Sequence, residues 1–184
     1  METILETQRL ILRTWSDADV EPFADMMSDP HVMRYYARPM DRGRAVEVAQ
    51  TMRERLEANR YGRFVMQIKG DDRYAGMMVL DDIRYDVPFE PRREVGWILP
   101  EFTWGHGYAP EAASALLDYA FTNLEWPEVI AMAVTHNHPS QRVMQKIGMV
   151  RDTSVNFEMP TMPGCAPQPF VLYRSRCDRR PMEA

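Results

Sequence analysis

Two glycines, Gly105 and Gly107, stand directly before a segment with strong helical patterning. Glycine allows backbone conformations and close approaches that other residues do not. The first turn of a helix adds N–H groups without partners and the positive end of the helix dipole. These features together predict a cradle for a phosphate or pyrophosphate. The competing interpretation is a turn that only begins a helix.

The glycine loop matches neither of two common nucleotide-binding motifs. No Gly-Lys-Ser/Thr follows it, as a Walker loop requires, and the third glycine of a Rossmann fingerprint is missing. A protein that uses the loop for ATP is therefore retained only as an alternative.

A second group of polar residues follows thirty positions after Gly107, where Asn137 and Ser140 open a short helical segment. Pro139 stands at its start and Gly148 at its end, as is typical of helix termini. Asn137 and Ser140 could contact a ligand, or they could cap the first amides of the helix.

Three motifs in this order resemble the GNAT superfamily of acyl-CoA N-acyltransferases, particularly its RimJ/RimL-like branch of ribosomal-protein N-terminal acetyltransferases. They are TQRLILRTWSDADVEPF near the N-terminus, EVGWILPEFTWGHGYAPEA around the glycines, and NHPSQRVMQKIGM after them. The three motifs span residues 7 to about 150.

The resemblance implies that the chain binds acetyl-CoA as cosubstrate and needs no metal. It implies that the strand Gly96 to Leu99 splays from its neighbour and pairs its main chain with pantetheine. It also implies that the amides of the glycine loop hold the pyrophosphate, and that Asn137 contacts the pantetheine or the departing sulfur, with Ser140 close to it. The cofactor-binding candidates are Trp97, Ile98, Leu99, Trp104, Gly105, His106, Gly107, Tyr108, Ala109 and Asn137.

Three positions depart from the family pattern. Phe102 replaces a common Gln or Arg, Pro110 replaces a common threonine, and Met144 stands where some branches carry a catalytic tyrosine. The first two leave the cofactor prediction intact because main-chain amides do that binding. The third removes one candidate acid.

Attack of an amine on a thioester requires a neutral amine and a stabilised thiolate. At pH 7 roughly a tenth of N-terminal α-amines are neutral, against less than about 0.1% of lysine amines. Glu94 is the candidate general base, and an exposed strand glutamate is its alternative. Ser140 is the candidate that assists the leaving sulfur. The reaction requires no covalent nucleophile, so neither Cys165 nor Cys177 is assigned one.

The remaining candidates are given less weight. His136 and His138 form a His-x-His pair without a third ligand nearby, so no metal site is predicted. His106 is expected to face solvent or a phosphate. Aromatic residues could line an acceptor groove or pack in the core, and two aspartates could attract a cationic substrate or end a strand in solvent; these are Trp15, Tyr35, Tyr36, Asp81 and Asp82.

The elements that must position these residues follow from periodicity. The pattern predicts a mixed α/β (α+β) domain, and the resemblance implies a GNAT-like fold with a mixed, mainly antiparallel central sheet of about seven strands flanked by four helices. The predicted strands are 7–15, 64–69, 75–83, 93–99, 128–134, 149–157 and 170–176, and the predicted helices are 17–28, 44–58, 109–121 and 139–147.

Length and composition indicate one domain over residues 1–184, with a frayed tail at 177–184. The net charge of −5 argues against a nucleic-acid surface, and no apolar run is long enough for a membrane span. The N-terminus lacks the pattern of a signal peptide, and two cysteines do not make a disulfide framework. We expect a cytoplasmic protein that is a monomer or a homodimer.

The predicted function is an N-acetyltransferase that moves an acetyl group from acetyl-CoA to a primary amine by direct attack in a ternary complex. The acceptor is expected to be a protein N-terminal α-amine or a small amine, with an aminoglycoside or polyamine as the nearest variation. The alternative is a non-catalytic acyl-CoA-binding or interaction domain of the same fold.

Overall fold

One eight-stranded sheet, in the order β1-β2-β3-β4-β5-β6-β8-β7, forms the centre of the computed structural model, which describes residues 1–71 and 73–177. The strands are β1 (Thr3–Glu6), β2 (Leu10–Arg13), β3 (Gly62–Ile68), β4 (Tyr74–Asp82), β5 (Arg93–Ile98), β6 (Glu128–Val134), β7 (Val150–Pro160) and β8 (Pro167–Arg176). The helices are α1 (Val20–Ser28), α2 (Arg42–Asn59), α3 (Tyr108–Thr122) and α4 (His138–Lys146), with 3₁₀ turns at Asp17–Asp19 and Glu101–Thr103.

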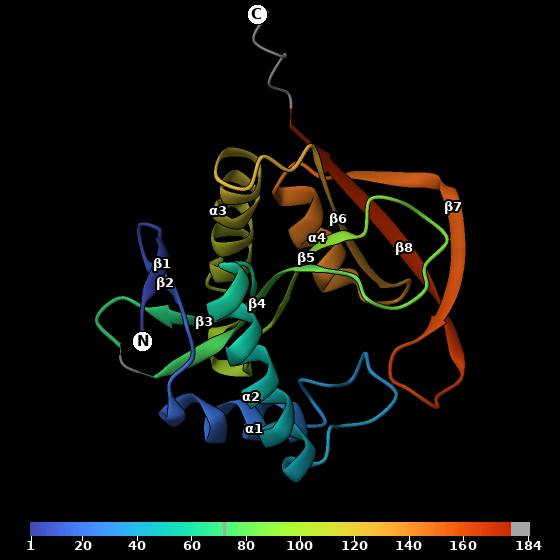
Figure 1. The fold of residues 1–184 in the computed structure, drawn as a ribbon. Helices are drawn as coiled ribbons and strands as arrows, with labels where there is room; N and C mark the ends of the chain where they lie inside the picture. The colour runs from blue at the N-terminus through green and yellow to red at the C-terminus, as the bar shows by residue number, and fades with distance from the viewer. Residues whose placement is uncertain (72, 178–184) are drawn as a thin grey trace, which may run out of the picture.

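Helices cover both faces of the sheet. Figure 1 shows α1 and α2 in front of the sheet and α3 and α4 behind it. The apolar stripe of α3 is buried as its periodicity predicts, through Ala112, Ala113, Leu116, Leu117 and Ala120. The predicted mixed, mainly antiparallel fold with four helices is confirmed.

The sheet differs from the prediction at its ends. The short strand β1 was not predicted, because its four residues are only half buried and show no alternation. The β7–β8 hairpin is longer than predicted and leaves a tip of six residues, 161–166. Its prolines, Pro160 and Pro167, pair at the hairpin end, where β7 is an edge strand that tolerates a missing N–H. The predicted frayed tail lies, beyond Cys177, outside the described residues.

The strands β5 and β6 form the parallel pair in the sheet, and they part almost at once. Six residues of β5 pair with β4 and seven of β6 pair with β8, but β5 and β6 share the single pair Glu94–Ile130. Beyond that pair the edge of β5 facing β6 is open. The prediction that the strand Gly96 to Leu99 splays from its neighbour is confirmed.

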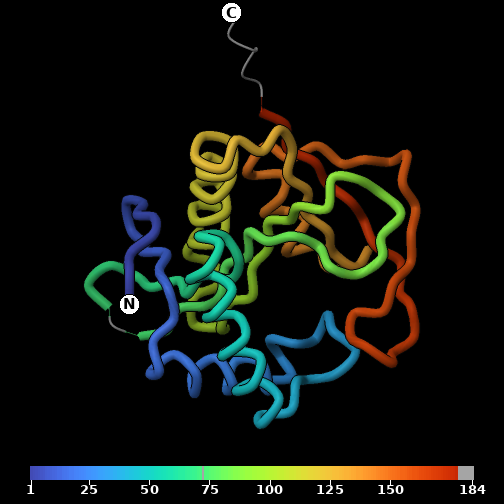
Figure 2. The backbone as a smooth tube through the Cα atoms, viewed as in Figure 1, coloured from blue at the N-terminus to red at the C-terminus, as the bar shows by residue number. Residues whose placement is uncertain are grey.

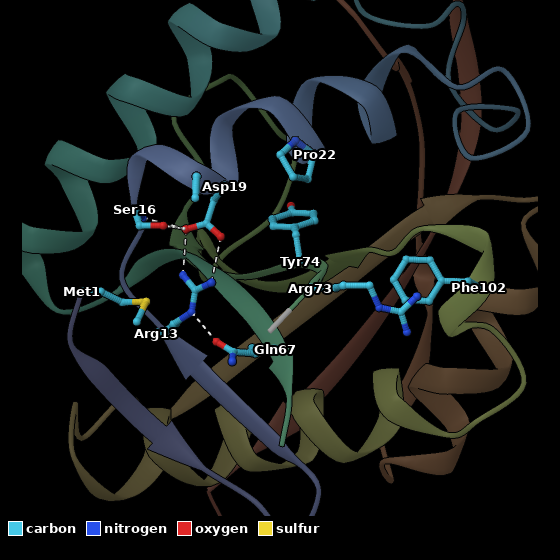
Figure 3. A pocket seen from close by; sticks show the side chains of 10 residues that line it. Met1, Arg13, Ser16, Asp19, Pro22, Gln67, Arg73, Tyr74 and Phe102 are labelled. Atoms are coloured by element: carbon cyan, nitrogen blue, oxygen red, sulfur yellow. Dashed lines mark hydrogen bonds and ion pairs between the residues drawn. The ribbon is translucent and has the colours of Figure 1, made fainter. Parts of the chain in front are cut away.

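A buried ion pair ties β2 to the start of α1. The two terminal nitrogens of Arg13 each donate to the Asp19 carboxylate at 2.8 Å, and Arg13 Nε donates to Gln67 Oε1 at 2.8 Å. Ser16 adds its backbone N–H and its hydroxyl to the same carboxylate, both at 2.7 Å. The network lies beside a pocket of about 550 Å³ (Figure 3).

Two connections far apart in sequence meet at one end of the molecule. The α1–α2 connection, residues 29–41, lies beside the hairpin tip 161–166 in Figure 2. The backbone N–H of Ala37 donates to Thr161 Oγ1 at 2.9 Å, which joins them. Among the described residues no helix is long and apolar enough to cross a membrane.

We predict that Asp19→Ala lowers the free energy of unfolding by about 3–5 kcal/mol, because it leaves the buried guanidinium of Arg13 uncompensated. Urea unfolding measures the change. Asp17→Ala is the matched control in the same turn, since Asp17 is exposed and pairs with Arg53 at the surface. That variant should lose less than about 1 kcal/mol. Equal losses of unfolding free energy in the two variants would contradict the claim that the buried ion pair stabilises the fold more than the exposed one.

The Asp19 contribution also depends on pH. Burial alone would raise the pKa of Asp19, but the hydrogen bonds from Arg13 and Ser16 outweigh it and hold the pKa below the ordinary 3.8. Because the folded-state pKa lies below the unfolded one, the stabilisation is present above about pH 4 and is lost as pH falls through the folded-state pKa. The difference between wild type and Asp19→Ala should therefore shrink in acid.

Candidate active site

A pocket of about 770 Å³ occupies the opening between β5 and β6. Its walls come from β3, β4, β5 and β6, from the first residues of α3 and α4, and from the two connections that meet at Ala37 and Thr161. The splay therefore produces a cavity large enough for a ligand of cofactor size.

One wall of this pocket is the loop that begins α3. Gly105 and Gly107 both have φ of 79°, in the left-handed region, and Gly107 caps the helix. The amides of Tyr108 and Ala109 in the first turn have no hydrogen-bond partner of ordinary geometry in the described chain. Pro110 comes next and lacks an N–H to satisfy. The loop therefore has the free amides that the predicted anion cradle requires.

The loop is held from outside by Arg9, which precedes β2. Arg9 donates to the carbonyl of His106 at 2.9 Å and, through Nε, to the Glu111 carboxylate at 2.7 Å. Its guanidinium also lies 4.9 Å from the centre of the Tyr108 ring. Glu111 accepts a further bond from Thr7 Oγ1 at 2.6 Å. No local pattern in the sequence indicates this support, because its members lie about a hundred residues apart.

Asn137 caps α4, as its alternative interpretation stated. Its Oδ1 accepts from the Ser140 backbone N–H at 3.1 Å. Both side chains also line the pocket, and neither the Asn137 amide nitrogen nor the Ser140 hydroxyl has a partner within the described residues. Capping therefore leaves two donors available to a ligand.

Glu94 lies at the inner end of the opening, at the one pair that β5 shares with β6. Burial raises the pKa of its carboxyl to about 7, Arg63 opposes that rise and Asp81 adds to it. The carboxylate lines the pocket and, among described residues, accepts no hydrogen bond. Glu94 is half-buried rather than fully exposed, because its strand position places it in the wall of the cavity.

Aromatic residues surround this end of the pocket. Tyr35, Tyr36 and Tyr85 line it, whereas Trp15 lies in the core with its indole nitrogen bonded to the Arg63 carbonyl at 2.6 Å. Burial, and next the charge of Glu94, raise the pKa of both Tyr36 and Tyr85, so these phenols stay protonated near neutral pH. Sequence analysis did not single out Tyr85 or Arg63.

The other candidates divide by whether they reach the pocket. Most cofactor-binding candidates line it, namely Trp97, Ile98, Leu99, Trp104, Gly105, Gly107, Tyr108, Ala109 and Asn137. His106 is exposed and does not line it, since its ring stacks on Tyr108 outside. Asp81 and Asp82 do not line it either: Asp81 is buried between Arg63 and Arg84, and Asp82 accepts from Tyr61.

Met144 is buried and lines the pocket, so no hydroxyl stands at that position. His136 lies with its ring 5.7 Å from that of Tyr35. Across residues 1–71 and 73–177, no group of three or more His, Cys, Asp or Glu side chains could hold a metal ion.

Comparison with known proteins places these features in a family. The family model for the acetyltransferase (GNAT) domain matches residues 9–150. The uncharacterized N-acetyltransferase YnaD of Bacillus subtilis is 30% identical over 148 residues, which are 80% of this chain and 83% of that protein. The uncharacterized N-acetyltransferase p20 of Bacillus licheniformis is 31% identical over 159 residues, 83% and 87% of the two chains.

Solved structures agree. An acetyltransferase from Agrobacterium tumefaciens superposes with a TM-score of 0.76 at 26% identity, covering 96% of this chain and 95% of that one. The spermidine N-acetyltransferase of Vibrio cholerae, solved with CoA and spermine, has a TM-score of 0.72 at 18% identity, with coverage of 92% and 96%. At that identity the second likeness concerns the fold alone.

We predict that the Glu94 carboxyl titrates near pH 7 in the free protein. Infrared difference spectra between pH 5 and pH 9 should show a protonated-carboxyl band that Glu94→Gln removes. In Arg63→Gln the band should persist to higher pH, because the opposing positive charge is gone. A band that disappears below pH 5 would contradict the burial of this group.

Proposed function

The chain belongs to the GNAT family of acetyltransferases, and from this we propose that it transfers an acetyl group from acetyl-CoA to a primary amine by direct attack within a ternary complex. The observation that carries the proposal is the shared pocket. One opening contains the free amides at the start of α3, the open edge of β5, two free donors at the start of α4, and the half-buried carboxylate of Glu94.

Each part of acetyl-CoA has a group of suitable chemistry along this opening. The free amides and the helix dipole at Tyr108 and Ala109 suit the pyrophosphate. The open main-chain edge between Gly96 and Leu99 suits the amide groups of pantetheine, which can pair with it as a strand would. The Asn137 amide and the Ser140 hydroxyl suit the sulfur end, because each can still donate.

The chemistry requires one base. The neutral amine attacks the thioester carbonyl carbon, a C–N bond forms, and the C–S bond breaks. The amine loses one proton, and the CoA thiolate gains one to leave as free thiol. Glu94, with a pKa of about 7, is ionised in about half of the molecules at neutral pH and can take the proton from the amine directly or through water. Ser140 can donate toward the departing sulfur.

The acceptor we propose is an amine that is partly neutral near pH 7, such as an α-amine. A base with a pKa of about 7 is better matched to an amine of pKa about 8 than to a lysine of pKa about 10.4.

We predict that acetyl-CoA raises the melting temperature by roughly 5–10 °C at 100 times its Kd, from about 2.7 kcal/mol of linkage. Gly107→Asp should abolish the shift, because its side chain, at a left-handed position, would lie 3.5 Å from Arg9 Nη2 and disturb the contact by which Arg9 holds the loop. Gly70→Asp is the matched control: Gly70 also has φ of +79°, has no atom within 4 Å of an added Cβ, and does not line the pocket. A shift retained in Gly107→Asp would place the pyrophosphate elsewhere.

We predict that Glu94→Gln lowers kcat about 10²- to 10⁴-fold with little change in acetyl-CoA binding. The measurement is amine-dependent release of CoA thiol from pH 5.5 to 9. Wild-type kcat/KM should bend near pH 7, and the variant should lose that bend. Near wild-type kcat would overturn Glu94 as base. Binding of acetyl-CoA without amide formation from any amine would overturn the proposed reaction.

A further inference from the structure

Three hydrogen-bond donors gather around the Glu94 end of the pocket without acceptors. The Arg63 guanidinium and the hydroxyls of Tyr36 and Tyr85 belong to side chains that line the cavity, with Tyr85 at its exposed side, and none has a hydrogen-bond partner in the described chain. The charges of Arg63 and Glu94 both act on the two phenols, so the four groups form one cluster. This end therefore offers many donors and one carboxylate.

Arg63 has spare binding capacity. The carboxylate nearest to it is Asp81, whose Oδ2 lies 4.0 Å from Nε, beyond hydrogen-bond reach. Its side chain is 28% exposed, against 5% for Asp81. Arg63 lines the cavity, and the two terminal amino groups of its guanidinium, which can bind a carboxylate as a planar fork, make no hydrogen bond in the described chain.

Sheet register puts Arg63 and Glu94 over the same cavity. Arg63 on β3 pairs with Val79 on β4, which pairs with Gly96 on β5. Glu94 is two residues from Gly96, so its side chain lies on the same face as Arg63. Gly96 itself has no side chain, and a Cβ there would approach Val79 to 3.6 Å. With β4 between them and neighbouring strands about 4.8 Å apart, the two charged side chains can contact opposite ends of one small molecule.

The charges of the pocket disfavour a polyamine. The charged side chains that line it in the described chain are Arg34, Arg63, Arg142, Lys146 and the single carboxylate Glu94. A polycation would meet one carboxylate and several like charges. A dianion such as a phosphate would in turn meet the carboxylates of Glu94 and Asp81 beside Arg63. An acceptor with one amine and one singly charged anionic group avoids the repulsion that a polycation would meet and the repulsion that a dianion would meet.

Resting on the proposed function, we propose that the acceptor is an amino acid-like amine whose own carboxylate binds the Arg63 guanidinium while its amine faces Glu94. The Tyr36 and Tyr85 hydroxyls donate to the same carboxylate. The shared chemistry, an amine and a carboxylate on one molecule, has two sources: a free amino acid, or a peptide whose first residue has an acidic side chain.

The test measures thiol release from acetyl-CoA with pairs of acceptors that differ only in a carboxylate. One arm compares free amino acids with their amides, with kcat/KM expressed per neutral amine to correct for amine pKa. The other arm compares peptide amides that begin with Glu or Gln. In wild type the carboxylate form of at least one pair should be preferred about ten- to a hundredfold. The arm that shows the preference identifies the source.

Arg63→Gln raises the pKa of Glu94 and so should lower the rate with both acceptors of a pair, but it should remove the ratio between them. Arg63→Lys, which keeps the charge but loses the fork, should retain part of the preference. Arg84→Gln is the matched control, because Arg84 contacts the same Asp81 at 3.5 Å but does not line the pocket, and it should keep the full preference.

Two results would overturn the inference alone: equal use of carboxylate and neutral forms by wild type in both arms, or a preference that survives Arg63→Gln. No acetylation of any acceptor would overturn the proposed function and this inference with it. Acetylation of neutral amines without a carboxylate preference leaves the proposed function supported and rejects only the acceptor class.

Discussion

The single pair between β5 and β6 is the constraint on which the site depends. Had the two parallel strands stayed in register, their main chains would have satisfied each other and left no open edge. Because they part after Glu94, the sheet exposes backbone donors and acceptors inside the protein rather than at its rim. Polar main chain in the interior needs a partner, and a ligand with amide groups can be one. The opening therefore creates unpaired backbone groups, and a ligand that binds in it can satisfy them.

The same opening sets the electrostatics. Glu94 is the residue at which the two strands still pair, and it lies half-buried in the wall of the pocket. Burial favours the neutral form of the Glu94 carboxyl and raises its pKa, and the positive charge of Arg63 limits that rise. A fully solvated carboxylate would be a weak base, and a fully isolated one would not ionise at all near pH 7. One cation at moderate distance keeps the group between these extremes.

Local patterns were sufficient for most of the fold. The apolar face of α3, the glycines before it and the proline and glycine at the ends of α4 are each signalled within a few residues. The predicted bounds of the β7–β8 hairpin were less accurate, and β1 was not predicted. Backbone pairing holds such strands at the ends of the sheet, and it places little constraint on the types of their side chains. In the site, Glu94, Asn137 and Ser140 were found from motifs. Arg9, Arg63 and Tyr85 were not, since their contacts join segments distant in sequence. Trp15, an aromatic candidate for the acceptor groove or the core, lies in the core.

The bond between Ala37 and Thr161 has a consequence for how such proteins diversify. Part of the pocket wall is formed by two connections that contact each other, whereas the candidate base lies on a strand and the candidate cradle begins a helix. Val32 and Met33 anchor one of these connections in the core, but its residue at the contact, Ala37, is exposed. Exchanges at exposed positions of the two connections can therefore change the acceptor without altering the core, and substrate range is free to diverge faster than the fold.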